Sequence, residues 1–176
     1  MNHYDTILIV GSGGREHSIG WKLLQDTTKK IFFAPGNGGT ENNIEIDSSD
    51  LLKLCEFAKQ NNSFTIVGPE KPLSLGIVDL FEKNQLPIFG PSKSASRLES
   101  SKVFSKVFMR EMGIQTASFS VFSDASSAIE YVKSSSKKVV VKVDGLAAGK
   151  GVFVCDSTTL AIEAIRKIFN DSEFTD

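Results

Sequence analysis

The stretch TILIVGSGGREH, residues 6–17, decides the fold that the sequence predicts. Residues 6–10 form an apolar run, which is typical of a strand buried on both faces of a parallel sheet. A glycine turn follows at once, and Ile19, Leu23 and Leu24 then recur at helical spacing. A strand, a glycine turn and a helix in this order form the phosphate-binding start of a doubly wound α/β fold.

The glycine turn has the chemistry of an anion site, but it does not fit a dinucleotide well. The helix that follows offers free N–H groups and a partial positive charge, to which Arg15 adds a bidentate donor. Glu16 stands where the third glycine of the dinucleotide pattern should be, and the strand at 31–34 does not end in an acidic residue. A single phosphate on a sugar fits better. The alternative for Arg15 and Glu16 is a charge arrangement that only supports the helix, and His17 is expected to pack locally.

The alternation of strands and helices continues to about residue 91. An amphipathic helix is expected after a cap at Ser49 or Asp50, and another from Pro72 onward. Short apolar runs indicate strands at residues 31–34, 64–67 and 86–89, and the alternation of Ile44 and Ile46 indicates a short strand at 44–46. The sequence therefore predicts an α/β domain with a doubly wound parallel sheet.

Three glycine-containing turns follow strands of this predicted sheet, at residues 11–14, 35–39 and 68–70. Ligands of such open sheets bind beyond the carboxyl ends of the strands, where turns of this kind converge. We expect them to surround one small phosphorylated molecule. Glu70 is placed there to meet a cation or a hydroxyl, and the alternative is a surface carboxylate that caps the next helix.

The pattern changes after Pro91, and we place a domain boundary near residue 100. The patterns beyond Pro91 indicate a short series of elements: helices over 92–99 and 100–112, a strand at 119–122, a helix capped by Ser123 or Asp124, a hairpin, and a helix capped by Ser157 or Thr158. The short sheet still needs cover on its edges and on its second face. We therefore expect this second unit to be incomplete.

The hairpin is the stretch VVVKVDGLAAGKGVFV, residues 139–154, and its loop is rich in glycine. β-Branched residues favour a strand on each side, with Lys142 in the first strand and Lys150 in the loop. A Walker P-loop is excluded, because only three residues separate Gly145 from Gly149 and a strand follows where a helix is needed. The loop has the chemistry of a flap over phosphate oxygens. The alternative is a mobile surface hairpin with a solvated lysine.

Composition and charge narrow the class of protein. The 176 residues are 40% hydrophobic and 23% charged, which is an ordinary globular balance. A formal net charge of −1 gives no basic field, so we expect no nucleic-acid partner. The apolar run at 7–10 is too short for a signal peptide or a membrane span, so we expect a cytoplasmic protein without a membrane partner. Cys55 and Cys155 lack metal-site spacing, and we predict no metal ligands.

Five motifs, in this order and at these separations, resemble one family: GSGGREH, APGNGGT, VGPEKPLSLGIVD, IFGPSKSASRLESSK and VVVKVDGLAAGKGV. They are similar to the amino-terminal part of the phosphoribosylamine–glycine ligases, or glycinamide ribonucleotide synthetases, which are purine-biosynthesis enzymes of the ATP-grasp superfamily. The resemblance covers essentially the whole chain and would correspond to less than half of a complete ligase. It implies a pre-ATP-grasp domain over residues 1–100 and the start of an ATP-grasp domain, with its glycine-rich lid, over residues 101–176.

The resemblance also implies a reaction and its partners. ATP would phosphorylate the carboxylate of glycine, and the amine of 5-phosphoribosylamine would attack the acyl phosphate. The substrate-site residues implied in this way lie in the three turns: Gly11, Gly13, Gly14, Arg15, Glu16, Pro35, Gly36, Asn37, Gly68, Pro69 and Glu70. The implied ATP-site residues lie in the hairpin and at a helix start: Lys102, Lys142, Asp144, Gly145, Leu146, Ala147, Ala148, Gly149, Lys150 and Gly151.

Metal ions and oligomeric state complete the expectations that follow from the resemblance. The acidic and amide ligands for Mg²⁺ or Mn²⁺ in ATP-grasp enzymes come from a later subdomain, so none is expected in this chain. We therefore expect a monomer that binds the sugar phosphate but does not turn over by itself. Two alternatives stay open, namely another ATP-grasp enzyme, such as a biotin carboxylase or a carboxyaminoimidazole ribonucleotide synthase, and a non-enzymatic nucleotide-binding module.

Overall fold

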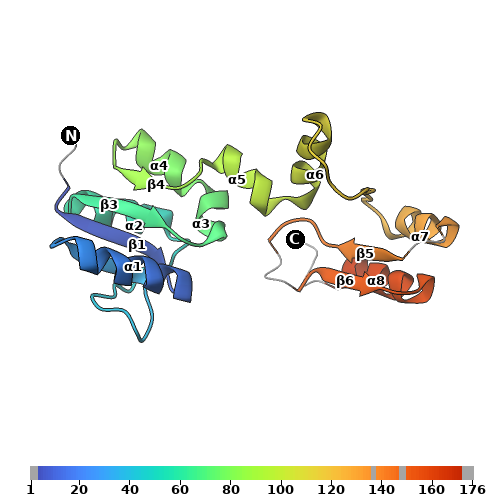
Figure 1. Cartoon of the computed structure of the whole chain (residues 1–176), viewed down its shortest axis with the longest axis horizontal. Helices are drawn as coiled ribbons and strands as arrows, with labels where there is room; N and C mark the ends of the chain where they lie inside the picture. The colour runs from blue at the N-terminus through green and yellow to red at the C-terminus, as the bar shows by residue number, and fades with distance from the viewer. Residues whose placement is uncertain (1–3, 136–137, 147–149, 172–176) are drawn as a thin grey trace. The chain divides into compact units, whose positions relative to one another are not determined.

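The computed structural model describes residues 4–135, 138–146 and 150–171, and the chain divides into two compact units. Unit 1 is Met1–Ser100, drawn from blue through green in Figure 1, and unit 2 is Ser101–Asp176, drawn from yellow to red. Each unit has its own sheet and its own hydrophobic core.

The sheet of unit 1 is parallel throughout, with the strand order β2-β1-β3-β4. Its strands are β1 (Thr6–Gly11), β2 (Lys30–Pro35), β3 (Ser63–Val67) and β4 (Ile88–Phe89). β1 pairs with β2 on one side and with β3 on the other, and its residues 7–10 are at most 4% exposed. The predicted parallel α/β fold is confirmed.

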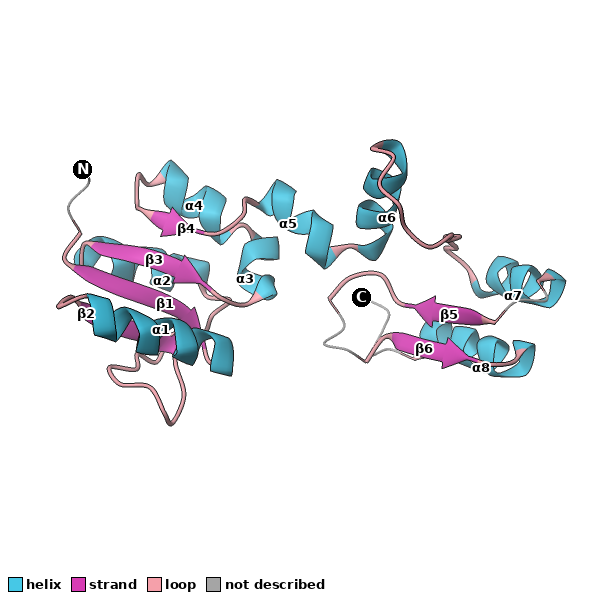
Figure 2. Ribbon diagram, in the orientation of Figure 1, coloured by secondary structure: helices cyan, strands magenta, loops and turns pink. Residues whose placement is uncertain are grey.

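Helices cover both faces of this sheet. Along β1, alternate side chains enter two different cores, one with α1 (Gly14–Asp26) and one with α2 (Leu51–Gln60) and α4 (Ile77–Lys83). The residues of β1 divide as Ile7 and Ile9 toward α1, and Leu8 and Val10 toward α2 and α4. Figure 2 shows α1 and α2 on opposite sides of the strands. This is the doubly wound arrangement, which leaves the carboxyl ends of the strands open for the turns.

The helix predicted after residue 70 is divided into α3 (Glu70–Leu75) and α4, and α5 (Lys93–Ser100) follows later. Gly76 separates α3 from α4 with a φ of +98°. Its N–H donates to the carbonyls of the last turn of α3, which is how a left-handed glycine ends a helix. Ile77 and Phe81, both on α4, are nevertheless fully buried.

The strand predicted at residues 44–46 is wrong. The N–H of Ile44 donates to the carbonyl of Phe33 at 2.9 Å, beside a single bridge between Phe33 and Asn43, and no ladder continues from it. The side chains of Ile44 and Ile46 pack against the core. Their alternation therefore marks contact with the core and not strand pairing. The strand predicted at 86–89 is shorter than expected, because only β4 pairs with β3.

Unit 2 is built on an antiparallel hairpin of β5 (Val139–Lys142) and β6 (Val152–Cys155). The helices α7 (Ala125–Ser134) and α8 (Thr158–Asn170) share a core with one face of the hairpin, and Asp124 and Ser157 cap them. The predicted hairpin and both predicted helices are confirmed. The remaining helix of the unit is α6 (Lys102–Glu111).

The strand predicted at residues 119–122 is also wrong. The segment contains residues that favour a strand, but it forms no ladder with β5 or β6. Phe119 instead lies near the cationic groups of Lys106 and Arg110 on α6, at 5.8 and 5.3 Å from its ring centre. Phe122 packs against the ring of Tyr131 on α7. Aromatic packing on two helices therefore replaces the strand pairing that the sequence pattern favours.

Candidate functional site

The glycine turn after β1 leads directly into α1. β1 ends at Gly11, Gly13 is the N-cap residue, and α1 begins at Gly14. The first N–H groups of a helix have no carbonyl partner within it, and they carry the positive end of its dipole. Apart from its chain neighbours and the backbone of its own helix, nothing lies within 4 Å of the place that a Cβ would take on Gly14. The amides at residues 14 and 15 are therefore available to an anion.

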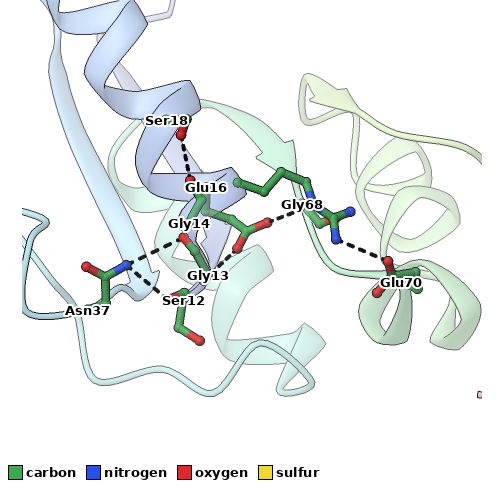
Figure 3. A network of polar contacts seen from close by, with 9 residues as sticks. Ser12, Gly13, Gly14, Glu16, Ser18, Asn37, Gly68 and Glu70 are labelled. Carbon is green, nitrogen blue, oxygen red and sulfur yellow. Dashed lines mark hydrogen bonds and ion pairs between the residues drawn. The ribbon is translucent and has the colours of Figure 1, made fainter. Parts of the chain in front are cut away.

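Glu16 is turned into the protein, where its exposed fraction is 4%. Its Oε2 accepts a hydrogen bond from the N–H of Gly13 at 2.7 Å, as Figure 3 shows. This is the carboxylate half of a capping box, in which a side chain in the first helical turn pairs with the N-cap amide. The amide of Gly13 is thus already used. The sequence left open whether Glu16 belongs to an anion site or only supports the helix, and this geometry matches the second interpretation.

Glu16 also packs against the turn after β3. A Cβ on Gly68 would lie 1.9 Å from Oε1 of Glu16, and a Cβ on Gly11 would lie 2.6 Å from its Cγ. Only glycine allows such an approach. Within the described residues Oε1 has no hydrogen-bond partner, and the nearest cationic atom is Nε of Arg15 at 3.8 Å. Two of the three predicted turns therefore meet around one buried carboxylate.

Asn37 ties the turn after β2 to the same place. Its Nδ2 donates to the carbonyl of Ser12 at 2.9 Å, as drawn in Figure 3. Its Oδ1 accepts a hydrogen bond from the N–H of Gly39 in its own loop. Gly36 donates its N–H to the carbonyl of Gly11 at 3.2 Å, and Pro35 is the register partner of Gly11. The side-chain amide of Asn37 is therefore engaged within the protein, where it fixes the position of the first turn.

Arg15 connects the first turn with the third. Its guanidinium donates to the carbonyl of Gly68 at 2.8 Å and to Oε1 of Glu70 at 3.2 Å. Pro69 is the N-cap residue of α3, and Glu70 is its first residue. The N–H of Glu70 itself, and then the guanidinium of Arg15, hold the pKa of the Glu70 carboxyl below its ordinary value. The side chains of Arg15 and Glu70 are 59% and 43% exposed, so both remain open to a ligand.

In unit 2, the predicted ATP-site residues gather where the glycine loop leaves β5. Nζ of Lys102, the first residue of α6, donates to the carbonyl of Gly145 at 2.7 Å. The carboxylate of Asp144 accepts from the hydroxyl of Ser101 at 3.0 Å and from the N–H of Val103 at 3.1 Å. The start of α6 and the start of the loop therefore form one connected site.

Opposing effects act on the carboxyl of Asp144. Burial works to raise its pKa, and the hydrogen bonds from Val103 and Ser101 work to lower it. The hydrogen bonds prevail together, so the pKa of Asp144 lies below its ordinary value. The group is thus an anion at neutral pH, and donors of the protein itself hold it.

Lys142 is exposed on the face of the hairpin that the helices do not cover. It pairs with Val152 across the ladder, while its neighbour Val141 faces the helices. The N–H of Val143 donates to the carbonyl of Gly151 at 2.8 Å, which closes the base of the loop. The remaining predicted loop residues divide into those exposed, Leu146 and Lys150, and those outside the described residues, Ala147, Ala148 and Gly149.

Among the residues that the structure describes, there is no group of three or more His, Cys, Asp or Glu side chains able to hold a metal ion. None of the helices in the same residues combines the length and the apolarity that a membrane span requires.

Two residues of these sites were missed in the sequence. A Cβ on Gly20 would lie 2.2 Å from Cζ of Phe33. The close approach of helix and strand that the third glycine of the dinucleotide pattern allows therefore occurs here at Gly20, one helical turn after position 16. A glycine inside a helical pattern is the signal for such an approach. Ser101 caps α6 by accepting from the N–H of Phe104 and also donates to Asp144. A serine at a helix start predicts the cap, but nothing local indicates the second contact.

Comparisons with known proteins agree with this geometry. Residues 5–99 match the family model described as "Phosphoribosylglycinamide synthetase, N domain", and residues 100–176 match "Phosphoribosylglycinamide synthetase, ATP-grasp (A) domain". The phosphoribosylamine–glycine ligase of Clostridium acetobutylicum is 47% identical over 165 residues, which are 91% of this chain and 40% of that protein. The chain thus spans about 40% of the length of the curated relatives it matches.

Solved structures give the same result. The crystal structure of phosphoribosylamine–glycine ligase from Thermotoga maritima matches with a TM-score of 0.76 and 33% identity, over 97% of this chain and 41% of that one. The N5-carboxyaminoimidazole ribonucleotide synthetase of the same organism has a TM-score of 0.63 at 16% identity, over 86% of this chain and 41% of that one, and so shares the fold alone. Because the family models together match residues 5–176, the chain belongs to the phosphoribosylglycinamide synthetase family.

Proposed function

We propose that this chain is the amino-terminal part of a cytoplasmic, ATP-dependent ligase that joins glycine to 5-phosphoribosylamine. A carboxylate oxygen of glycine attacks the γ-phosphorus of ATP and ADP leaves. The amine nitrogen of the sugar phosphate then attacks the carbonyl carbon of glycyl phosphate, phosphate leaves, and the nitrogen loses a proton. The products are glycinamide ribonucleotide, ADP and phosphate. The acyl phosphate supplies the leaving group that a free carboxylate lacks.

The observation that carries this proposal is the meeting of three turns at the start of α1. Helix amides at residues 14 and 15 and the guanidinium of Arg15 suit the dianionic 5-phosphate of the sugar. Arg15 already contacts Gly68 and Glu70, so the phosphate would lie between the first and third turns. Glu70 and the loop of Asn37 would then border the sugar and its amine, with residues 1–100 as the sugar-phosphate domain.

Residues 101–176 would begin the domain that binds ATP. Lys102 and Lys142 would neutralise phosphate oxygens, and the loop from Asp144 to Gly151 would lie over them and exclude water from the acyl phosphate. ATP reaches the site of such ligases as its Mg²⁺ or Mn²⁺ complex, and the ion would supply charge neutralisation on the phosphates. The ligands for that ion would come from the part of the relatives' length that this chain does not span.

Isothermal titration tests the sugar-phosphate site. Ribose 5-phosphate and glycinamide ribonucleotide should bind, and NAD should not. Arg15→Ala should weaken binding of ribose 5-phosphate by about tenfold, as expected for one lost charge-assisted contact. Lys22→Ala is the matched control, because Lys22 is an exposed cation of the same helix whose partner is Asp26. Binding of NAD in preference to ribose 5-phosphate, or an equal loss in Lys22→Ala, would overturn the proposal.

Turnover is tested separately with a coupled assay of ADP release. The curated relatives are more than twice as long as this chain, so we expect the 176 residues to bind the sugar phosphate without ligase turnover. Release of ADP that requires glycine, phosphoribosylamine and magnesium together would contradict this expectation.

A further inference from the structure

The carboxylate of Asp144 performs a task that direct ATP binding does not explain. Oδ2 accepts from the hydroxyl of Ser101 at 3.0 Å, and Oδ1 accepts from the N–H of Val103 at 3.1 Å. Ser101 is the N-cap residue of α6, and Val103 lies in its first turn. Asp144 therefore caps a helix that begins more than 40 residues earlier in the chain. A charged acceptor at this position also interacts favourably with the helix dipole.

Ser101 and Val103, which donate to Asp144, flank Lys102. The hydroxyl of Ser101 is used twice, because it donates to Asp144 and accepts from the N–H of Phe104 at 3.1 Å. The backbone on each side of Lys102 is thus fixed against the base of the glycine loop. From this backbone, Nζ of Lys102 reaches the carbonyl of Gly145, the residue after Asp144, at 2.7 Å.

We infer that Asp144 is a positioning residue that holds Lys102 and the first residues of the glycine loop as one unit. The inference rests on the proposed ATP site and gives Asp144 a role distinct from contact with the nucleotide. The carbonyl of Gly145 holds the ammonium of Lys102 where a phosphate oxygen would arrive. An anionic oxygen is the stronger acceptor, so ATP would take Lys102 from Gly145 and leave Asp144 in place.

The first test measures the affinities of the whole chain for ATP and for adenosine. Asp144→Ala should weaken ATP binding about tenfold and leave adenosine binding unchanged, because only the phosphate contact depends on Lys102. Asp144→Asn keeps an oxygen acceptor for Val103 and should weaken ATP binding less. Lys102→Ala should add little in the Asp144→Ala background, since both changes remove the same contact.

Asp124→Ala is the matched control. Asp124 caps α7 in the same unit by accepting from the N–H of Ser127 at 2.8 Å, so its loss removes a comparable cap. The ratio of ATP to adenosine affinity should stay at the wild-type value in this variant. An equal change of the ratio in Asp124→Ala and Asp144→Ala would mean that lost helix stability explains both, and the inference would be overturned.

The second test needs no nucleotide and therefore separates this inference from the proposed function. Hydrogen exchange of the free chain should speed up in Asp144→Ala at the amides of Val103 and Val143 together. If the wild-type chain binds no ATP, the proposed function fails. If the two amides exchange at wild-type rates in Asp144→Ala, or if that variant binds ATP as well as the wild type, the positioning role of Asp144 is rejected.

Discussion

The glycine turn after β1 and the glycine loop after β5 are each held by one carboxylate, and they differ in where that carboxylate comes from. Glu16 lies three residues after the amide that it caps, so the turn after β1 is fixed by its own helix. Asp144 lies in the glycine loop and caps α6, which is distant in the sequence. Glu16 is buried, whereas Asp144 is exposed to solvent. The first turn is therefore fixed by a buried carboxylate, and the second depends on a contact that solvent can reach.

Gly68→Ala should have the largest effect on the first turn. The new Cβ would lie 1.9 Å from Oε1 of Glu16, so the buried carboxylate must leave its bond to Gly13. Overpacking of this kind lowers the free energy of unfolding by about 3 kcal/mol. Gly38→Ala is the control, because nothing lies within 4 Å of a Cβ there. Urea unfolding followed by circular dichroism measures both, and equal midpoints for the two variants would contradict the packing.

The clash can be assigned to Glu16 with a double-mutant cycle. In a Glu16→Ala background the atoms that meet the new Cβ of residue 68 are gone, so Gly68→Ala should cost less there than in the wild type. We expect a coupling free energy of at least about 1 kcal/mol. Additive costs would show that Glu16 does not hold the two turns together.

Glu16→Ala alone should have the next largest effect. It removes a capping bond and leaves a small cavity, which should lower the free energy of unfolding by about 1–2 kcal/mol. Glu16→Gln retains an oxygen that can accept from Gly13 and should cost less. The affinity for ribose 5-phosphate should fall more in Glu16→Ala than in Glu16→Gln, because the hydrogen bond between Glu16 and Gly13 fixes the turn. An unchanged affinity in Glu16→Ala would show that the turn keeps its shape without the cap.

The fold of unit 1 can be predicted from the sequence because its signals are local. Residues 7–10 are apolar at every position, which is typical of a strand covered on both faces. The predicted strands at 44–46 and 119–122 fail because alternation records burial and cannot show whether a hydrogen-bonding neighbour exists. Ile44 meets the core, and Phe119 meets cations of α6, without any ladder.

Of the candidate site, too, only the part with local signals could be predicted from the sequence. The meeting of three turns follows from parallel strands, whose carboxyl ends share one edge of the sheet. The inward orientation of the Glu16 side chain cannot be predicted from the sequence, because a carboxylate in the first helical turn either faces a ligand or caps the helix. Its inward direction depends on the space left by Gly68, and the contact of Asp144 depends on the distant residue Ser101. Such contacts between distant residues have no local pattern.

The contact between Arg15 and Glu70 should have the smallest effect on stability, although it is the most visible contact between two turns. Both side chains are largely exposed, and such ion pairs contribute about 0–1 kcal/mol. Glu70→Gln should therefore shift the urea midpoint less than Glu16→Gln at neutral pH.

The pH dependence of the free energy of unfolding shows whether Glu70 stabilises the chain through its charge. The pKa of Glu70 is lower in the folded chain than its ordinary value of 4.5, so its contribution is present above that pH and is lost as the pH falls through the lowered value. Wild type and Glu70→Gln should therefore converge in stability on acidification. A difference that persisted or grew below pH 4.5 would mean that Glu70 supports α3 in some way other than through its charge. The third turn would then resemble the first, fixed by its own helix, and Arg15 would be left for the ligand.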